Sequence, residues 1–133
     1  MKKPTRHQQR IWALQLLYSL DINSELNKTT AQTKIRTLKK NEDLEDRKYY
    51  FETLIYRVLD KLEEYNQIID EKAIKWSIQR MPYVDRNILR IAICEIKYEI
   101  PTGVAINEAV ELAKEFADAK SASFINGILA KIE

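Results

Sequence analysis

The spacing of the apolar residues constrains this chain more than any other feature of its sequence. Through most of the 133 residues, apolar side chains recur every three or four positions, which places them on one face of an α-helix. No segment alternates apolar and polar residues between turn signals, as a half-buried strand does. Only two glycines and three prolines are present, which also argues against many tight hairpins. The sequence therefore predicts an all-α protein.

About seven helices are expected, separated by polar or proline-containing segments. Pro4 is expected in the first helical turn, and residues 21–27 are expected to form a polar loop. Pro82 disfavours a helical conformation at Met81, and Ser121 is expected to cap the last helix. The apolar stripes that carry this prediction lie at residues 11–20, 30–40, 46–72, 84–98, 106–116 and 121–132.

The stripes also indicate how the helices pack. Residues 46–72 are expected to form one long helix. The apolar residues between Val84 and Tyr98 cover most of a helix circumference, which is typical of a helix at the centre of a bundle. Because the stripes need one another for burial, we expect a compact bundle. Its two small helical subdomains, about 1–75 and 80–133, are expected to form one domain.

The composition excludes several classes of site. The one cysteine, Cys94, cannot form an internal disulfide and lies in an apolar stretch, where a core position is expected. The one histidine, His7, has no partner at metal-ligand spacing, so neither a metal nor a cofactor is expected. No apolar run approaches the roughly 18 residues of a membrane span, and no signal peptide is evident. We therefore expect a cytoplasmic protein.

Catalysis is not expected either. No cluster of polar residues has the spacing of a nucleophile with its base. Glu108, Glu111 and Glu115 lie on the polar side of the stripe at 106–116 and are expected to form a solvated face. Glu111 and Lys114 can pair across one turn there, which stabilises a helix only slightly.

The start of the chain is basic. Its first 20 residues carry four lysines and arginines and no acidic residue, although the whole chain has a net charge of only +2. Arg6 and Arg10 are four residues apart and share a face if helical, and Lys3 and His7 extend that face. Arginine offers a planar fork of donors to phosphates and base edges. On charge alone a solvated terminus is the favoured interpretation of this arm, with a nucleic-acid contact as the alternative.

A second candidate surrounds the break before residue 84. Met81, Pro82, Tyr83 and Arg86 combine a backbone break, an aromatic ring and a cation at a helix start. Single-stranded RNA is bound by aromatic rings that stack on bases, with cations beside the phosphates. On the residues alone, packing of Tyr83 in the core and capping of the helix by Asp85 are the favoured alternative.

A third candidate lies at the start of the last helix. Lys120 and Ser121 would present free backbone N–H groups there, which can receive a phosphate. Phe124 follows, and its spacing favours a core position.

Four motifs in the chain resemble those of the NusB family. The resemblance covers the whole chain and is densest from Trp76 onward. The motifs are Arg10 followed by Ala13-Leu14-Gln15-Leu16-Leu17-Tyr18; Val84-Asp85-Arg86-Asn87-Ile88-Leu89-Arg90-Ile91-Ala92 followed by Glu95; Ile100-Pro101 followed by the run from Val104 to Lys114; and Phe124-Ile125-Asn126-Gly127-Ile128-Leu129.

The resemblance implies a function as well as a fold. It implies an all-helical protein that binds the boxA element of ribosomal RNA leader transcripts. It implies a heterodimer with NusE, a small-subunit ribosomal protein, and a place in the RNA polymerase antitermination complex. Catalysis is not implied.

By position, the resemblance also assigns contacts. NusE contacts fall on Tyr18, Ile22 and Asp85. RNA contacts fall on Arg6, His7, Arg10, Met81, Pro82, Tyr83, Arg86, Lys120, Ser121 and Phe124.

The chain departs from the family pattern mainly in its cations. His7, Gln8 and Gln9 stand where many members have arginines, and Ser123 stands where a lysine often precedes the phenylalanine. Fewer fixed charges predict weaker RNA binding that depends less on salt.

Two alternative functions are considered: a protein-interaction adaptor with little RNA binding, and the RNA-binding domain of a ribosomal RNA methyltransferase. The second is disfavoured, because 133 residues starting at Met1 leave no room for a catalytic domain. The free protein could also form a homodimer.

Overall fold

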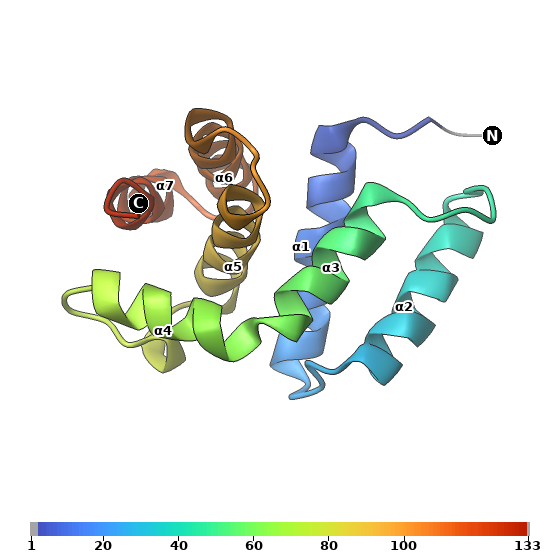
Figure 1. The fold of residues 1–133 in the computed structure, drawn as a ribbon, viewed down its shortest axis with the longest axis horizontal. Helices are drawn as coiled ribbons and strands as arrows, with labels where there is room; N and C mark the ends of the chain where they lie inside the picture. The colour runs from blue at the N-terminus through green and yellow to red at the C-terminus, as the bar shows by residue number, and fades with distance from the viewer. Residues whose placement is uncertain (1–2, 133) are drawn as a thin grey trace.

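The computed structural model describes residues 3–132, and over that range the chain forms α-helices joined by short loops (Figure 1). No β-strand occurs among these residues, so the all-α prediction is confirmed. Seven α-helices and one short 3-10 helix are formed within this range. They are α1 (Arg6–Ile22), α2 (Lys28–Asn41), α3 (Tyr50–Asp60), α4 (Leu62–Lys72), η1 (Ile78–Arg80), α5 (Tyr83–Lys97), α6 (Thr102–Phe116) and α7 (Ala119–Leu129).

Helix α5 is the centre of the molecule, as its sequence predicted. All its residues from 87 to 95 are buried, and α1, α3, α4, α6 and α7 pack against it. In Figure 1, α1, α2 and α3 lie to the right of α5, whereas α6 lies above it and α7 to its left. One hydrophobic cluster contains buried side chains from all seven helices. The two predicted halves therefore share a core, and their division near residues 76–82 stays a prediction.

The helix predicted at 46–72 is divided. It begins at Tyr50, because Glu52 accepts a hydrogen bond from the backbone N–H of Tyr49 at 2.9 Å and caps the start. It is interrupted at Lys61, whose φ of −118° lies outside the helical range. Helix α4 then leaves in a new direction, which lets Tyr65 and Ile69 pack in the core (Figure 1). The apolar spacing continues across Lys61, so periodicity alone could not reveal the break.

Three predicted helix ends were also wrong. Thr5 caps α1 through a 3.0 Å hydrogen bond to the N–H of Gln8, so Pro4 lies before the helix. Asp21 belongs to α1, which continues to Ile22 instead of ending in a polar loop. The cap of α7 is Asp118, which accepts from the N–H of Ser121 at 2.7 Å. Side-chain hydrogen bonds decided these ends, because a cap needs an acceptor in reach of a free N–H.

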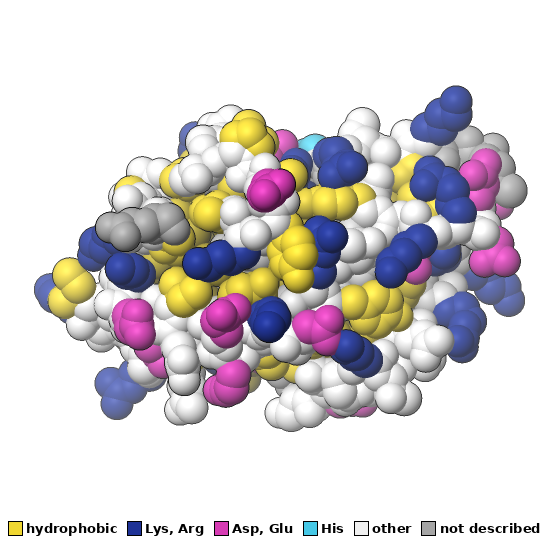
Figure 2. Space-filling view, viewed as in Figure 1, with side chains coloured by type: hydrophobic (Ala, Val, Ile, Leu, Met, Phe, Trp, Pro, Cys, Tyr) yellow, Lys and Arg dark blue, Asp and Glu magenta, His cyan; other side chains and the backbone are white. Residues whose placement is uncertain are grey.

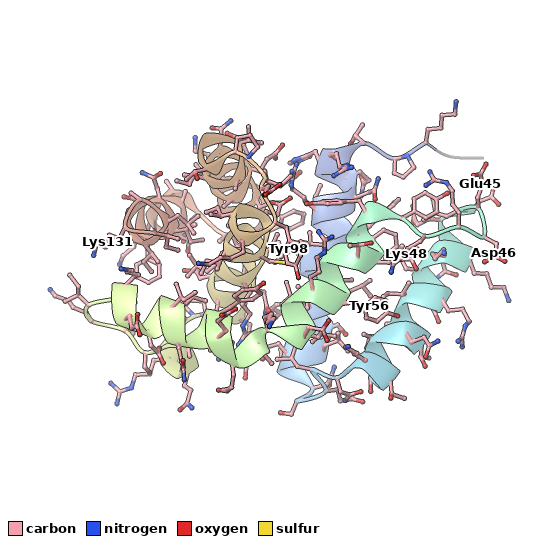
Figure 3. The ribbon with its side chains drawn as sticks, viewed as in Figure 1. Glu45, Asp46, Lys48, Tyr56, Tyr98 and Lys131 are labelled. Atoms are coloured by element: carbon pink, nitrogen blue, oxygen red, sulfur yellow. The ribbon has the colours of Figure 1, made fainter. Side chains whose placement is uncertain are left out.

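The face drawn in Figure 2 is not uniformly basic. On the side drawn in Figure 2, apolar side chains gather mainly over α4–α7, whereas lysines and arginines are spread across the whole face. Some cations are held by aromatic rings: Arg57 lies 3.8 Å above the ring of Tyr98, which Figure 3 labels. Among residues 3–132, no helix has both the length and the apolar character needed to cross a membrane.

Candidate nucleic-acid interface

The structure divides the candidate RNA-binding residues among three places. Arg6, His7 and Arg10 lie in the first turns of α1. Tyr83 and Arg86 lie where α5 begins beside the end of α1. The remaining five line one pocket between the start of α5 and α7: Met81, Pro82, Lys120, Ser121 and Phe124.

Arg10 is a buried side chain rather than a surface cation. Its Nε donates to Oε2 of Glu95 at 2.9 Å, and only 6% of its side chain is exposed. The Tyr50 hydroxyl donates to the same carboxylate. Burial and the Glu95 carboxylate raise the pKa of Tyr50 above its ordinary value. Arg6 and Arg10 do share a helix face, but packing covers the second and leaves the first exposed.

His7 connects α1 to α6. Its Nδ1 lies 3.1 Å from Oε2 of Glu108, and its Nε2 lies 3.5 Å from Oε2 of Glu115. Glu108 also meets Nη1 of Arg10 at 3.3 Å. The sequence predicted a solvated acidic face on α6, but two of its glutamates contact His7 and Arg10 of the basic arm. Arg6, whose guanidinium lies 3.8 Å above the ring of Tyr50, is the exposed arginine of this group.

A second buried cluster lies at the opposite end of α1. Asp21 accepts from Nε and Nη2 of Arg86, both at 2.7 Å, and from Nη1 of Arg90 at 3.0 Å. Asn87 donates to the same carboxylate at 2.9 Å. Burial raises the pKa of Asp21. The hydrogen bond from Arg86 and the charge of Arg90 together lower this pKa by more than burial raises it, so the pKa of the carboxyl lies below its usual range. Both arginines are therefore occupied within the protein.

Three exposed apolar side chains lie over this cluster. The rings of Tyr18 and Tyr83 meet edge to face with centroids 6.3 Å apart, and Ile22 lies one turn beyond Tyr18. The guanidinium of Arg86 lies 4.2 Å from the Tyr83 ring. Tyr83, together with Arg86, therefore lies beside two residues predicted to contact a protein partner.

Asp85, the third predicted partner contact, lies apart from Tyr18 and Ile22. It follows Tyr83 by two residues, which at about 100° per residue places it on the far side of α5. There it is 4% exposed and lines the pocket against α7. Burial raises the pKa of the Asp85 carboxyl, and the Ser121 hydroxyl only partly opposes this shift.

The sequence reasoning missed several residues that organise these places. Asp21, Arg90 and Glu95 hold the two buried ion clusters. A signal was present, because Arg90 and Glu95 interrupt the apolar run of a central helix, and buried charges need a partner of opposite sign. Trp76, which is 51% exposed at the rim of the α5–α7 pocket, was also missed.

Cys94 is expected to be unreactive in the folded protein. Its thiol is fully buried, and burial raises its pKa to about 12, so almost no thiolate forms at neutral pH. A thiol reagent such as Ellman's reagent should therefore modify the chain only as fast as it unfolds, and at the ordinary rate in denaturant. Rapid modification of the native protein would contradict the buried position.

No group of three or more histidine, cysteine, aspartate or glutamate side chains within residues 3–132 could hold a metal ion.

Comparison with known proteins gives a consistent result. The family model described as "NusB family" matches residues 7–133. The transcription antitermination protein NusB of Halothermothrix orenii is 53% identical, over 97% of this chain and 96% of its own. The protein of the same name from Bacillus mycoides is 41% identical, over 100% of this chain and 98% of its own.

The fold is similar to solved structures. Thermotoga maritima NusB matches with a TM-score of 0.78 and 28% identity, covering 98% of this chain and 91% of that one. A structure of the antitermination factors NusB and NusE in complex with double-stranded RNA matches with a TM-score of 0.78 and 26% identity, covering 96% of each chain. A chain in the structure of a plectonemic RNA supercoil gives a TM-score of 0.80 at 27% identity, with coverage of 95% and 93%.

Proposed function

The chain belongs to the NusB family, and from this we propose that it is a transcription antitermination factor that binds boxA RNA of ribosomal RNA leader transcripts together with NusE. The observation that carries the proposal is similarity along nearly the whole chain to proteins of that name and to a NusB solved with NusE and RNA. We assign it no catalytic step: it acts by holding RNA and protein together within the RNA polymerase antitermination complex.

Two separate surfaces of the structure support the binding of RNA and of NusE. The α5–α7 pocket has Lys120 and Arg80 at its rim and lies between the N-termini of α5 and α7, whose dipoles favour anionic groups. With Arg6, it forms the proposed RNA side. Tyr18 and Ile22 present exposed apolar surface at the end of α1, which suits the aromatic and apolar centre of a protein interface. They form the proposed NusE side.

Equilibrium binding of labelled boxA RNA and a scrambled RNA, at two salt concentrations, with and without NusE, tests the function. A preference for boxA that tightens with NusE is the expected result. Equal, weak and strongly salt-dependent binding of both RNAs would favour the adaptor alternative. That alternative retains support from one observation: Arg10 and Arg86 are neutralised by buried carboxylates, so fewer cations face solvent than the sequence indicates.

Replacing Arg6 and Lys120 with alanine should weaken boxA binding without unfolding the protein, because both side chains are exposed. The slope of log K against log salt should become shallower by about 0.7 for each RNA phosphate that the variant no longer neutralises. Lys61→Ala is the matched control, since this exposed lysine lies at the α3–α4 junction, where no RNA contact is proposed. Unchanged affinity and salt slope in the double variant would contradict the assignment of these cations.

A further inference from the structure

The pocket between α5 and α7 has the volume and the lining of a ligand site. Its volume is about 360 Å³, within the range of small-molecule sites. Trp76 and Phe124 supply aromatic surface, and Met81 and Pro82 add apolar surface. Such walls suit a planar ring, because aromatic rings stack on nucleobases whatever the base.

An unpaired hydrogen-bond acceptor lies in this lining. Oδ1 of Asp85 is the one buried side-chain oxygen or nitrogen without a partner among residues 3–132, and Asp85 is 4% exposed. Leaving a buried carboxylate oxygen unpaired costs stability, and a ligand seated in the pocket could supply the missing hydrogen bond. A carboxylate only accepts, so that ligand must present N–H or O–H groups.

The charges around the pocket select among such ligands. Arg80 and Lys120 lie at the rim, and the N-termini of α5 and α7 point positive dipole ends toward it. Asp118 is the acidic residue of the rim, and its carboxylate is engaged as the cap of α7. An arginine or lysine from a protein partner could donate to Asp85 but would face two cations on the way in. A nucleotide carries both the donors and the anionic phosphate that these groups favour.

The hollow continues beyond the aromatic rings. A second cavity of about 400 Å³ is also lined by Trp76 and Phe124. Lysines 72, 75 and 131 border it; Figure 3 labels Lys131 just after α7. A strand with one base in the first pocket would therefore keep its flanking phosphates near cations.

We propose that the pocket receives one unstacked guanine of single-stranded RNA, whose ring stacks on Trp76 and whose N1–H and N2–H₂ donors reach the Asp85 carboxylate. Guanine is the base with two adjacent donors on its pairing edge, whereas the pairing edge of uracil places carbonyl oxygens beside its single donor. The inference rests on the proposed RNA binding and deepens it by naming a base and its acceptor. It also assigns to Asp85 an RNA contact in place of the NusE contact implied by position.

The test uses the whole protein and three hexamers: hexauridylate, the same strand with one central guanosine, and the same strand with inosine there. Inosine lacks only the N2 amino group. The guanosine strand should bind about tenfold more tightly than the other two, the range expected of one good base contact. Stacking of a base on Trp76 should quench the tryptophan fluorescence. The change can be assigned to Trp76, because the other tryptophan, Trp12, is only 5% exposed in the core.

Three variants locate the effect. Asp85→Asn keeps the shape and removes the charge, and it should abolish most of the preference for guanosine over inosine. Trp76→Ala should weaken binding of all three strands, and Trp76→Phe should restore most of it. Asp85→Asn should unfold at no lower a temperature than the parent, because an ionised carboxylate with a raised pKa destabilises the fold at neutral pH; a merely structural Asp85 would instead lose stability on replacement.

The outcomes separate this inference from the proposed function. If the parent binds boxA RNA with NusE but shows no preference for guanosine, or if Asp85→Asn keeps that preference, the guanine site is wrong and the function stands. If Asp85→Asn loses NusE binding and keeps the preference, the pocket receives a cation of the partner protein. If the parent binds no RNA with or without NusE, the proposed function itself fails.

Discussion

Replacing Asp21 with alanine is expected to lower the free energy of unfolding by about 3–5 kcal/mol, the usual cost of removing one partner from a buried ion cluster. Asp21 accepts from both Arg86 and Arg90, and the side chain of Arg90 is almost fully buried. Without the carboxylate, two guanidinium groups remain close together at the α1–α5 contact and lose the carboxylate that accepts hydrogen bonds from both. Denaturant unfolding followed by circular dichroism measures the loss.

The matched control is Asp60→Ala. Asp60 pairs with Lys28, but both side chains are about half exposed, so its removal should cost less than about 1 kcal/mol. A similar loss in the two variants would contradict the importance of burial at Asp21.

The Asp21 effect should also depend on pH. The pKa of Asp21 is lower in the folded protein than in the unfolded chain. The carboxylate therefore contributes its full stability above the unfolded pKa of about 3.9, and this contribution disappears as pH falls through the lower, folded value. The difference in stability between the parent and Asp21→Ala should be constant near neutrality and shrink below about pH 4. A difference that grows with acid would contradict the ion cluster.

Replacing Arg10 with alanine should cost a similar amount, about 3–5 kcal/mol, because Glu95 would stay buried without its guanidinium. Any loss of RNA binding by this variant would therefore not identify Arg10 as an RNA contact. Thermal or denaturant unfolding of Arg10→Ala, measured beside its RNA affinity, shows whether the two effects occur together.

A double variant distinguishes a structural role of Arg10 from a direct contact with RNA. In Arg10→Met with Glu95→Gln, both charges are removed, and the glutamine can still accept from the Tyr50 hydroxyl. Replacing a buried ion pair with neutral groups of similar size is often nearly neutral, so most of the lost stability should return. If this folded variant binds boxA RNA as the parent does, Arg10 acts by positioning α1 against α5. If it stays folded and loses binding, Arg10 reaches RNA directly.

The sequence predicted the helices well where an apolar stripe lies between strong breaks. The helix from Tyr83 to Lys97 was correctly expected to be central, because apolar residues surround most of it. The same reasoning failed at Lys61, where the stripe passes from α3 into α4 without a change of period. It also ended α1 too early, because Asp21 is polar and the ion cluster that buries it comes from residues about 65 positions away.

At the candidate site, too, local sequence patterns did not predict contacts between residues that are distant in the sequence. The resemblance singled out residues 81–82 and 120–124 separately, and the fold brings them to one pocket. It singled out Arg10 and Arg86 as cations, but their availability depends on Glu95 and Asp21, which no local spacing connects to them.

The sequence by itself determined the fold class, the central helix and the family, because apolar periodicity and continuous motifs are local properties of the chain. The tertiary structure decided which charges are free and which are paired, and on which side of α5 each residue lies. Asp85 and Tyr83 are two positions apart, yet one lines the pocket against α7 and the other lies beside Tyr18. A helix turns about 100° per residue, so only the helices packed around it determine what each side chain meets.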